Sequence, residues 1–288
     1  MIYLQIIILA LIQGLAELLP VSSSAHVIVA EKLMGLDPSR PDLTFLLIML
    51  HTGTMFAVLF YFWPRWKPLL FPPGDKQGRY HFLTMVLVAS VCTAALGFTL
   101  IQGIEKIVLV KMLGHDKGEV EHLFKSLPLV ASGLFAVGIF ILIAGWRDIK
   151  TGSKPLETVS AVWIGLVQGL CLPFRGFSRS GATISTALVR GIARPLAEDF
   201  SFALAVLLTP PAIAWELRRL LKAADWQGNR ELLQLLTPGL VGMVFSFAAG
   251  LLALKILSAA LERGRWKYFG IYCLVAAAVV LIFALRGM

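Results

Sequence analysis

The feature that most constrains this chain is a series of long apolar segments separated by short polar ones. Six segments approach the roughly 20 residues that an α-helix needs to cross the hydrocarbon core of a bilayer. They occupy residues 43–63, 82–101, 127–146, 200–215, 240–257 and 269–285. The composition agrees, because 58% of the 288 residues are apolar, 15% are charged and the mean hydropathy is +0.80. The sequence therefore predicts an all-α integral membrane protein with six spanning helices.

The net charge of +9 does not indicate nucleic-acid binding. The basic residues gather in segments between the apolar runs, at 63–68, 146–154 and 262–267. In these connecting segments they can contact anionic lipid headgroups. We therefore expect membrane lipids as partners and no nucleic acid.

The cysteines and the N-terminus carry no targeting or metal signal. Cys92, Cys171 and Cys273 lie in apolar runs and share no motif spacing, so they are expected to be small buried apolar residues. The N-terminal segment MIYLQIIILALIQG lacks a basic region and a clear cleavage site. We therefore expect it to belong to the mature protein.

Two further apolar regions, 6–35 and 159–191, are each interrupted by a polar break that contains proline. Neither half of either region is long enough to cross a bilayer comfortably. Such a break is tolerated at membrane depth only where it is buried in protein or lines a wet cavity. We therefore predict a re-entrant helical hairpin in each region, with its polar tip inside the protein.

The two interrupted regions resemble each other. IQGLAELLPVSSSA begins at residue 12 and VQGLCLPFRGFSRSGA at residue 167, and both run from Gln-Gly-Leu through proline to a serine-rich turn. Three predicted spans separate the hairpins and three follow, and an odd number of crossings inverts the second copy. The sequence thus predicts a single membrane domain, 1–288, with inverted repeats at about 1–146 and 159–288 whose tips meet near the midplane.

The second tip is rich in donors for an anion. An ionisable residue inside a membrane protein indicates function, and the planar fork of Arg179 suits phosphate. Serines and Gly181 flank it, and an apolar helical stretch begins near residue 182. The free N–H groups at the start of that helix add to an anion site. The second tip is therefore predicted to bind phosphate. Its polar side chains are Arg175, Ser178, Arg179, Ser180 and Thr183.

The first tip adds acid–base groups and hydroxyls. Its candidates are Glu17, Ser22, Ser23, Ser24 and His26. A serine activated by a neighbouring Glu or His, opposite an anion clamp, is the set of groups that phosphoryl transfer requires. Plainer interpretations stay open: the serines satisfy backbone groups, His26 is structural, or Glu17 simply pairs with Arg179. His51, in the HTGT run of the first span, could reach the cavity, but a helix-packing role is favoured.

Two other classes of protein share these features. Inverted repeats with broken helices are common in secondary transporters, so the same arginine could bind an anion or lipid phosphate in a carrier or flippase. A structural membrane subunit is a third reading, but it leaves Arg179 without a purpose. A carrier needs the anion clamp but no nucleophile, so the candidates in the first tip favour an enzyme.

The two motifs together resemble those of a known family. QGLAELLPVSSSAH (13–26) and GFSRSGATIS (176–185) are similar to the two signature motifs of bacterial undecaprenyl-diphosphate phosphatases of the bacitracin-resistance type, and the resemblance covers essentially the whole chain. It implies an enzyme of the bacterial inner membrane. Such an enzyme removes the terminal phosphate of a C55 isoprenoid diphosphate and yields the monophosphate carrier lipid for peptidoglycan synthesis.

The resemblance also implies roles for individual residues. Ser23 matches the family's proposed nucleophile, Glu17 and His26 match acidic and histidine positions of the first motif, and Arg179 matches the phosphate-binding arginine. A divalent cation, Mg²⁺ or Ca²⁺, is implied as well, with Glu17 as its ligand. The expected substrate-binding residues are Arg179, Ser178, Thr183, Ser22, Ser180, Gly181 and Gln13.

Two positions depart from the family pattern. Gln13 replaces the first Glu of the first motif, and a neutral amide is neither a base nor a strong cation ligand. Arg175 replaces a proline that often precedes the glycine of the second motif, which adds a second phosphate contact or changes the shape of the tip. Because Gln13 is not a carboxylate, a metal site with two carboxylates is not expected.

Orientation and oligomeric state are weakly encoded. Lys and Arg residues are nearly balanced between the two sides of the predicted topology. Because the longer loops at 102–126 and 216–236 count less in the positive-inside rule, we expect both termini and the active-site opening on the periplasmic side. The sequence leaves open whether the chain forms a homodimer.

Overall fold

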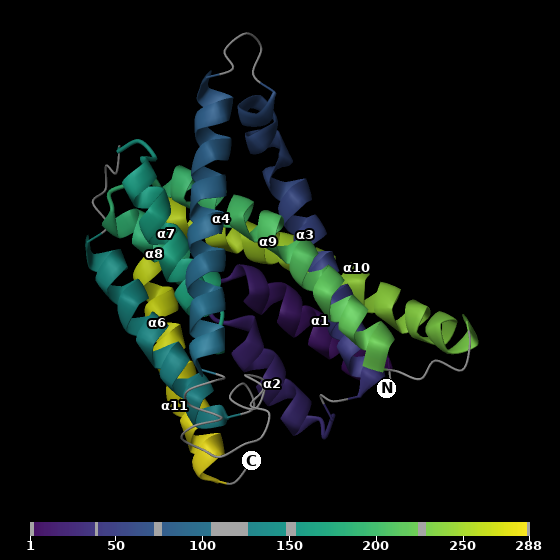
Figure 1. Cartoon of the computed structure of the whole chain (residues 1–288). Helices are drawn as coiled ribbons and strands as arrows, with labels where there is room; N and C mark the ends of the chain where they lie inside the picture. Colours follow the sequence, from purple (N-terminus) through teal and green to yellow (C-terminus); the bar gives the residue numbers. More distant parts are fainter. Residues whose placement is uncertain are drawn as a thin grey trace.

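The computed structural model describes residues 3–37, 40–71, 77–104, 126–147, 154–223 and 229–286. Within these ranges the chain forms ten α-helices and no β-strand (Figure 1). The helices are α1 Tyr3–Leu18, α2 Ser23–Leu33, α3 Pro41–Leu70, α4 Gln77–Gly103, α6 Leu127–Arg147, α7 Thr158–Cys171, α8 Arg179–Val189, α9 Arg194–Ala223, α10 Asn229–Glu262 and α11 Trp266–Leu285.

Six of the described helices are long and apolar enough to cross a membrane, namely α3, α4, α6, α9, α10 and α11. Each contains one of the six predicted apolar segments, which confirms the all-α class and the six candidate spans. One detail of the prediction is wrong, because residues 63–68 continue α3 and are not a connecting segment. α3 continues as a helix past Pro64 and Pro68 because its side chains pack here. Trp66 is buried, and Arg65 bonds to Glu198 of α9.

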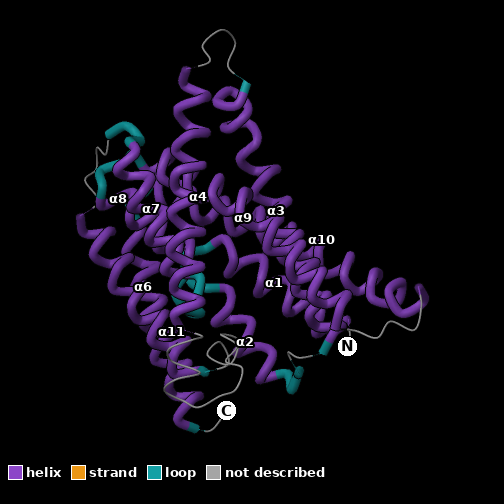
Figure 2. Tube along the Cα trace, in the orientation of Figure 1, coloured by secondary structure: helices purple, strands orange, loops and turns teal. Residues whose placement is uncertain are grey.

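The remaining helices form two short pairs, and these are the regions 6–35 and 159–191. α1 and α2 have 16 and 11 residues and are joined by the turn 19–22, which contains Pro20. α7 and α8 have 14 and 11 residues and are joined by residues 172–178, which contain Pro173. All four helices are shorter than the length that crosses a bilayer. Figure 2 shows the connecting turns among the long helices.

The short helices pack against long helices from the other half of the chain. α1 lies against α10, and α7 lies against α4. The glycine of each Gln-Gly-Leu run is at the contact. A Cβ on Gly14 would lie 2.6 Å from the Ser246 carbonyl oxygen of α10, and a Cβ on Gly169 would lie 2.9 Å from the Thr93 carbonyl oxygen of α4. Only glycine allows backbones to approach this closely.

The long helices pair across the two halves as well. α6 lies along α11, and α3 lies along α10, as Figure 1 shows. One apolar cluster contains side chains from both halves of the chain. Each short helix pair therefore packs against long helices from both halves of the chain.

All three cysteines are free thiols within helices. Cys171 and Cys273 are buried, and each thiol contacts a carbonyl oxygen, that of Val167 and that of Pro20. Cys171 and Cys273 are therefore small buried residues as predicted, whereas Cys92 is only partly buried. Cys273 ties α11 to the turn between α1 and α2.

A buried ion cluster joins α3 to α9. The Arg65 guanidinium donates to Glu198 at 2.9 Å and to Asp199 at 3.0 Å. The Glu198 side chain is only 3% exposed, and it also accepts a hydrogen bond from Ser258 of α10. The ion cluster therefore links α3, α9 and α10.

Arg65→Met should lower the free energy of unfolding by about 3–5 kcal/mol, because it leaves two carboxylates without their cation. Arg40→Met is the matched control, since Arg40 forms an exposed pair with Asp42 and should cost about 0–1 kcal/mol. Unfolding of both variants in detergent micelles measures the difference. Equal losses would contradict a buried role for the cluster.

Candidate functional site

A cavity of about 230 Å³ lies between the turns of the two short helix pairs. Both turns contribute to its wall, so residues more than 150 positions apart in the chain face the same space. The lining residues are Ala16, Glu17, Ser22, Ser23, Ser24, Cys171, Leu172, Phe174, Arg175, Phe177, Ser178, Arg179 and Ser180. The two polar turns, which lie far apart in the sequence, therefore line one cavity.

Glu17, in the last turn of α1, is the centre of the polar contacts. Its Oε2 accepts a hydrogen bond from Ser23 Oγ at 2.5 Å and one from Gln13 Nε2 at 3.1 Å. Its Oε1 accepts one from Arg179 Nη2 at 3.0 Å. A carboxylate this close to a serine hydroxyl can accept its proton, and the arginine beside it supplies positive charge for an anion.

The environment keeps the Glu17 carboxyl ionised. Burial raises the pKa of Glu17, but the charges of His51 and Arg179 and the hydrogen bonds from Ser23 and Gln13 outweigh it. The pKa of Glu17 therefore lies below its ordinary value. The carboxylate form is the one that can accept a proton from Ser23.

The first turn aims Ser23 at Glu17. α1 ends just before Pro20, which has no N–H to continue the helix. Ser22 then has a φ of 67° and a ψ of 96°, a conformation that residues other than glycine rarely adopt. Ser23 begins α2 directly after this residue. The reversal brings Ser23 back over the last turn of α1, where Glu17 lies.

The second turn presents the start of α8. Ser178 is the N-cap, and its Oγ accepts a hydrogen bond from the Gly181 N–H. Arg179 is the first residue of the helix. Gly176 has a φ of 89° and lies against the Val130 carbonyl oxygen of α6, so a side chain there would be both strained and obstructed. The partial positive charge of a helix N-terminus is thereby added to the arginine.

The two turns also contact each other directly. Ser180 Oγ donates to the Leu19 carbonyl oxygen at 3.3 Å, and the Gly176 N–H donates to Ser24 Oγ at 3.4 Å. These bonds fix the separation between the nucleophile candidate and the arginine. Ser22, Ser180 and Arg175 also line the cavity.

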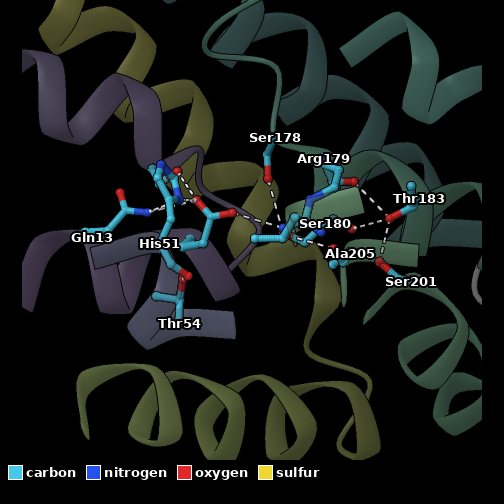
Figure 3. Close-up of polar contacts among 12 residues, drawn as sticks. Gln13, His51, Thr54, Ser178, Arg179, Ser180, Thr183, Ser201 and Ala205 are labelled. Carbon is cyan, nitrogen blue, oxygen red and sulfur yellow. Dashed lines mark hydrogen bonds and ion pairs between the residues drawn. The ribbon is translucent and has the colours of Figure 1, made fainter. Parts of the chain in front are cut away.

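His51 is closer to the site than the sequence indicates. Its Nδ1 lies 2.9 Å from Gln13 Nε2 and 3.8 Å from Glu17 Oε2 (Figure 3). From the sequence, a helix-packing role is expected for this histidine. The polar run HTGT inside an apolar span is the signal that could have placed it here.

Two predicted site residues point elsewhere. The Thr183 hydroxyl bonds the Arg179 carbonyl oxygen and lies 2.6 Å from Ser201 Oγ of α9, on the side of Arg179 away from Gln13 and His51 (Figure 3). His26 bonds the Ser22 carbonyl oxygen and Tyr272. Neither side chain is among the described residues that line the cavity.

The family model described as "Bacitracin resistance protein BacA" matches residues 6–279 of the chain. This protein belongs to the bacitracin resistance protein BacA family. The resemblance seen in the two motifs is thereby confirmed. Because the match extends from α1 into α11, it includes both turns of the candidate site.

Several relatives of this BacA-family chain match it over nearly its full length. Undecaprenyl-diphosphatase 2 of Acinetobacter baylyi is 55% identical over 98% of this chain and 98% of its own. Undecaprenyl-diphosphatases of Desulfosudis oleivorans and Desulforapulum autotrophicum are 35% and 31% identical. The first covers 98% of this chain and 99% of its own, and the second covers 96% of each.

The donor set of this BacA-family site limits how it can hold a metal ion. Glu17 is the one carboxylate among the described residues of the cavity wall. Across the described ranges, no three His, Cys, Asp or Glu side chains gather into a group that could hold a cation. Mg²⁺ is commonly held by one or two carboxylates together with substrate phosphates. Glu17 is therefore the one carboxylate that the described wall could offer to such a cation.

Proposed function

We propose that this protein is an undecaprenyl-diphosphatase, which hydrolyses undecaprenyl diphosphate to undecaprenyl phosphate and phosphate for cell-wall synthesis. Membership of the BacA family and the names of its relatives support this substrate. One observation carries the chemistry: Ser23 Oγ donates to Glu17, and the same carboxylate accepts a bond from Arg179. A nucleophile, a base and an anion-binding group are thus in direct contact.

In the proposed mechanism, Arg179 and the N-terminus of α8 bind the terminal phosphate. The guanidinium has five N–H donors, so it can hold phosphate oxygens while Nη2 remains near Glu17. Ser23 Oγ attacks the terminal phosphorus and passes its proton to Glu17. The bond between that phosphorus and the bridging oxygen breaks, and undecaprenyl phosphate leaves.

The second half of the reaction releases the phosphate. Glu17 passes its proton to the bridging oxygen of the leaving undecaprenyl phosphate, and it then accepts a proton from a water that attacks the phosphoserine. The bond between phosphorus and Ser23 Oγ breaks, phosphate departs, and Glu17 returns the proton to Ser23 Oγ. We assign proton transfer to Glu17 in preference to His26, because the serine hydroxyl already bonds that carboxylate.

A divalent cation, Mg²⁺ or Ca²⁺, is proposed to accompany the diphosphate, with Glu17 as the ligand that the protein supplies. It would neutralise charge that develops on the phosphate oxygens. Gln13 lies beside Glu17 but is an amide, which makes the site less dependent on a bound cation than two carboxylates would be.

Replacing Gln13 by Glu tests this arrangement. Gln13→Glu sets a second carboxylate beside Glu17, so without a cation the two charges repel. We expect activity to survive in Mg²⁺ and to fall more steeply than in the unchanged protein as free Mg²⁺ is lowered. Gln13→Met, which removes the amide without adding charge, is the control. Loss of activity of Gln13→Glu at every Mg²⁺ concentration would contradict the prediction.

We further infer that the chain is one membrane domain of two inverted repeats, each beginning with a re-entrant hairpin. The first repeat holds α1 to α6 and the second holds α7 to α11. In this scheme α1 corresponds to α7 and α4 to α10. The packing of α1 on α10 and of α7 on α4 then forms an equivalent pair of contacts, each with the glycine of a Gln-Gly-Leu run. These two equivalent contacts between a short helix of one half and a long helix of the other support the inverted repeat.

We also propose that the protein resides in the bacterial inner membrane and that the cavity opens to the periplasm. The distribution of basic residues over the shorter connecting segments supports this side. A C-terminal epitope tag should then be cleaved by protease added to intact spheroplasts. A tag that stays uncleaved would place the C-terminus on the cytoplasmic side and contradict the proposed orientation. Nothing in the proposed mechanism requires a second copy of the chain.

The function is tested by phosphate release from undecaprenyl diphosphate by the purified protein in detergent. We expect release of one phosphate for each lipid, stimulated by Mg²⁺ and reduced by a chelator. Undecaprenyl phosphate, the expected product, should not be hydrolysed further. If the protein binds the diphosphate and releases no phosphate under any cation, it is a carrier and the phosphatase proposal is wrong.

A further inference from the structure

His26 has both ring nitrogens engaged. Nδ1 lies 2.8 Å from the Ser22 carbonyl oxygen, and Nε2 lies 2.7 Å from the Tyr272 hydroxyl of α11. The two rings are stacked, with centroids 5.7 Å apart and an interplanar angle of 13°. The imidazole is therefore bonded at both nitrogens, to the turn before α2 and to α11, and its ring pairs with that of Tyr272.

These partners determine which nitrogen carries the proton. A carbonyl oxygen only accepts, so Nδ1 must be the N–H that donates to Ser22. In the neutral ring Nε2 is then an acceptor, and the Tyr272 hydroxyl donates to it. Burial lowers the pKa of His26, which favours this neutral form. A ring with both nitrogens occupied is better suited to hold the backbone than to carry a proton.

The peptide group that His26 bonds is directly next to Ser23, the proposed nucleophile. The Ser22 carbonyl belongs to the same peptide unit as the Ser23 N–H, and a peptide unit is planar. Ser22 has a φ of 67°, and it is the one residue other than glycine with a positive φ in the described part of the chain. Its N-cap position lacks a hydrogen bond from its own side chain to the helix. The bond from His26 therefore opposes relaxation of this turn.

We propose that Tyr272 is a positioning residue that acts through His26. Its hydroxyl fixes the imidazole, and the imidazole fixes the Ser22 peptide. The Ser23 hydroxyl is thereby kept on Glu17. This inference rests on the proposed phosphatase function and assigns a part in it to α11. Among the described residues that line the cavity, none belongs to α11.

Replacing Tyr272 with Phe tests the proposal, because Phe keeps the stacked ring and removes only the hydroxyl. We expect kcat to fall by about tenfold, the usual effect of one lost hydrogen bond on an oriented group, with KM within about twofold. Tyr268→Phe is the matched control. Tyr268 is an exposed tyrosine one turn earlier on α11, and its loss of a hydroxyl should leave kcat unchanged.

A double-mutant cycle shows whether Tyr272 acts through His26. In a His26→Ala background the imidazole is absent, so Tyr272→Phe should lower kcat no further. Unchanged kcat in the single Tyr272→Phe variant would overturn the proposal. A full additional loss in the His26→Ala background would do so as well. A change confined to KM would also overturn it, since it would mean that Tyr272 contacts the lipid.

The same assay separates this inference from the function on which it rests. If the unchanged protein releases phosphate and Tyr272→Phe matches it, only the role of Tyr272 is wrong. If the unchanged protein releases no phosphate, the phosphatase proposal fails and the positioning role fails with it. Elution of each variant as a folded, monodisperse species in detergent excludes misfolding as the cause of a lower kcat.

Discussion

Ser23→Ala should reduce phosphate release by about 10³-fold or more, since it removes the proposed nucleophile while the rest of the site stays in place. The substitution removes one oxygen and little volume, and it leaves the bond between Arg179 and Glu17 intact. Binding of undecaprenyl diphosphate should therefore survive. The measurements are single-turnover phosphate release and equilibrium binding of the lipid to the same purified variant.

Ser24→Ala is the control for this experiment. Ser24 lines the same cavity, but its Oγ lies 3.2 Å from Ser22 Oγ and accepts from the Gly176 N–H, so it faces the second turn. Its loss should be clearly milder than that of Ser23. Hydrolysis by Ser23→Ala at the unchanged rate would show that a water activated by Glu17, and not the serine, attacks phosphorus.

Arg179→Lys should lower kcat by about 10²-fold even though the positive charge remains. A lysine ammonium is a point charge, so it cannot reproduce the planar set of N–H donors that a phosphate needs while Glu17 is also held. The loss should fall mainly on kcat, because the charge on the phosphate oxygens is redistributed in the transition state. Steady-state kinetics over a range of lipid concentrations separates kcat from KM.

Arg190→Lys is the matched control for Arg179. Arg190 is the C-cap of the same helix, α8, and its guanidinium donates to Ser160 Oγ at 3.3 Å, away from the cavity. It should retain activity close to that of the unchanged protein. Normal turnover in Arg179→Lys at normal expression would contradict the phosphate clamp.

Much of the architecture could be read directly from the sequence. Apolar length predicts the six spanning candidates, because a bilayer imposes a minimum on each apolar run. The prolines in the two interrupted regions predict breaks for the same kind of local reason, since Pro20 and Pro173 cannot donate to a preceding turn. Helix ends were less predictable. α3 continues through residues 63–68 because Trp66 and Arg65 pack against other helices, and no local signal encodes such contacts.

The sequence by itself also determined which groups the site contains, since Glu17, Ser23 and Arg179 lie in two polar tips inside an apolar chain. Their contact is a tertiary fact, because it depends on two turns from different halves meeting at one cavity. Ser23 and His26 are three residues apart in α2, a spacing that places two side chains on one helix face. The positive φ of Ser22 and the hydroxyl of Tyr272 decided that Ser23 meets Glu17 while His26 faces α11. Side-chain direction after a turn depends on backbone dihedrals and distant partners, and neither can be read from local spacing.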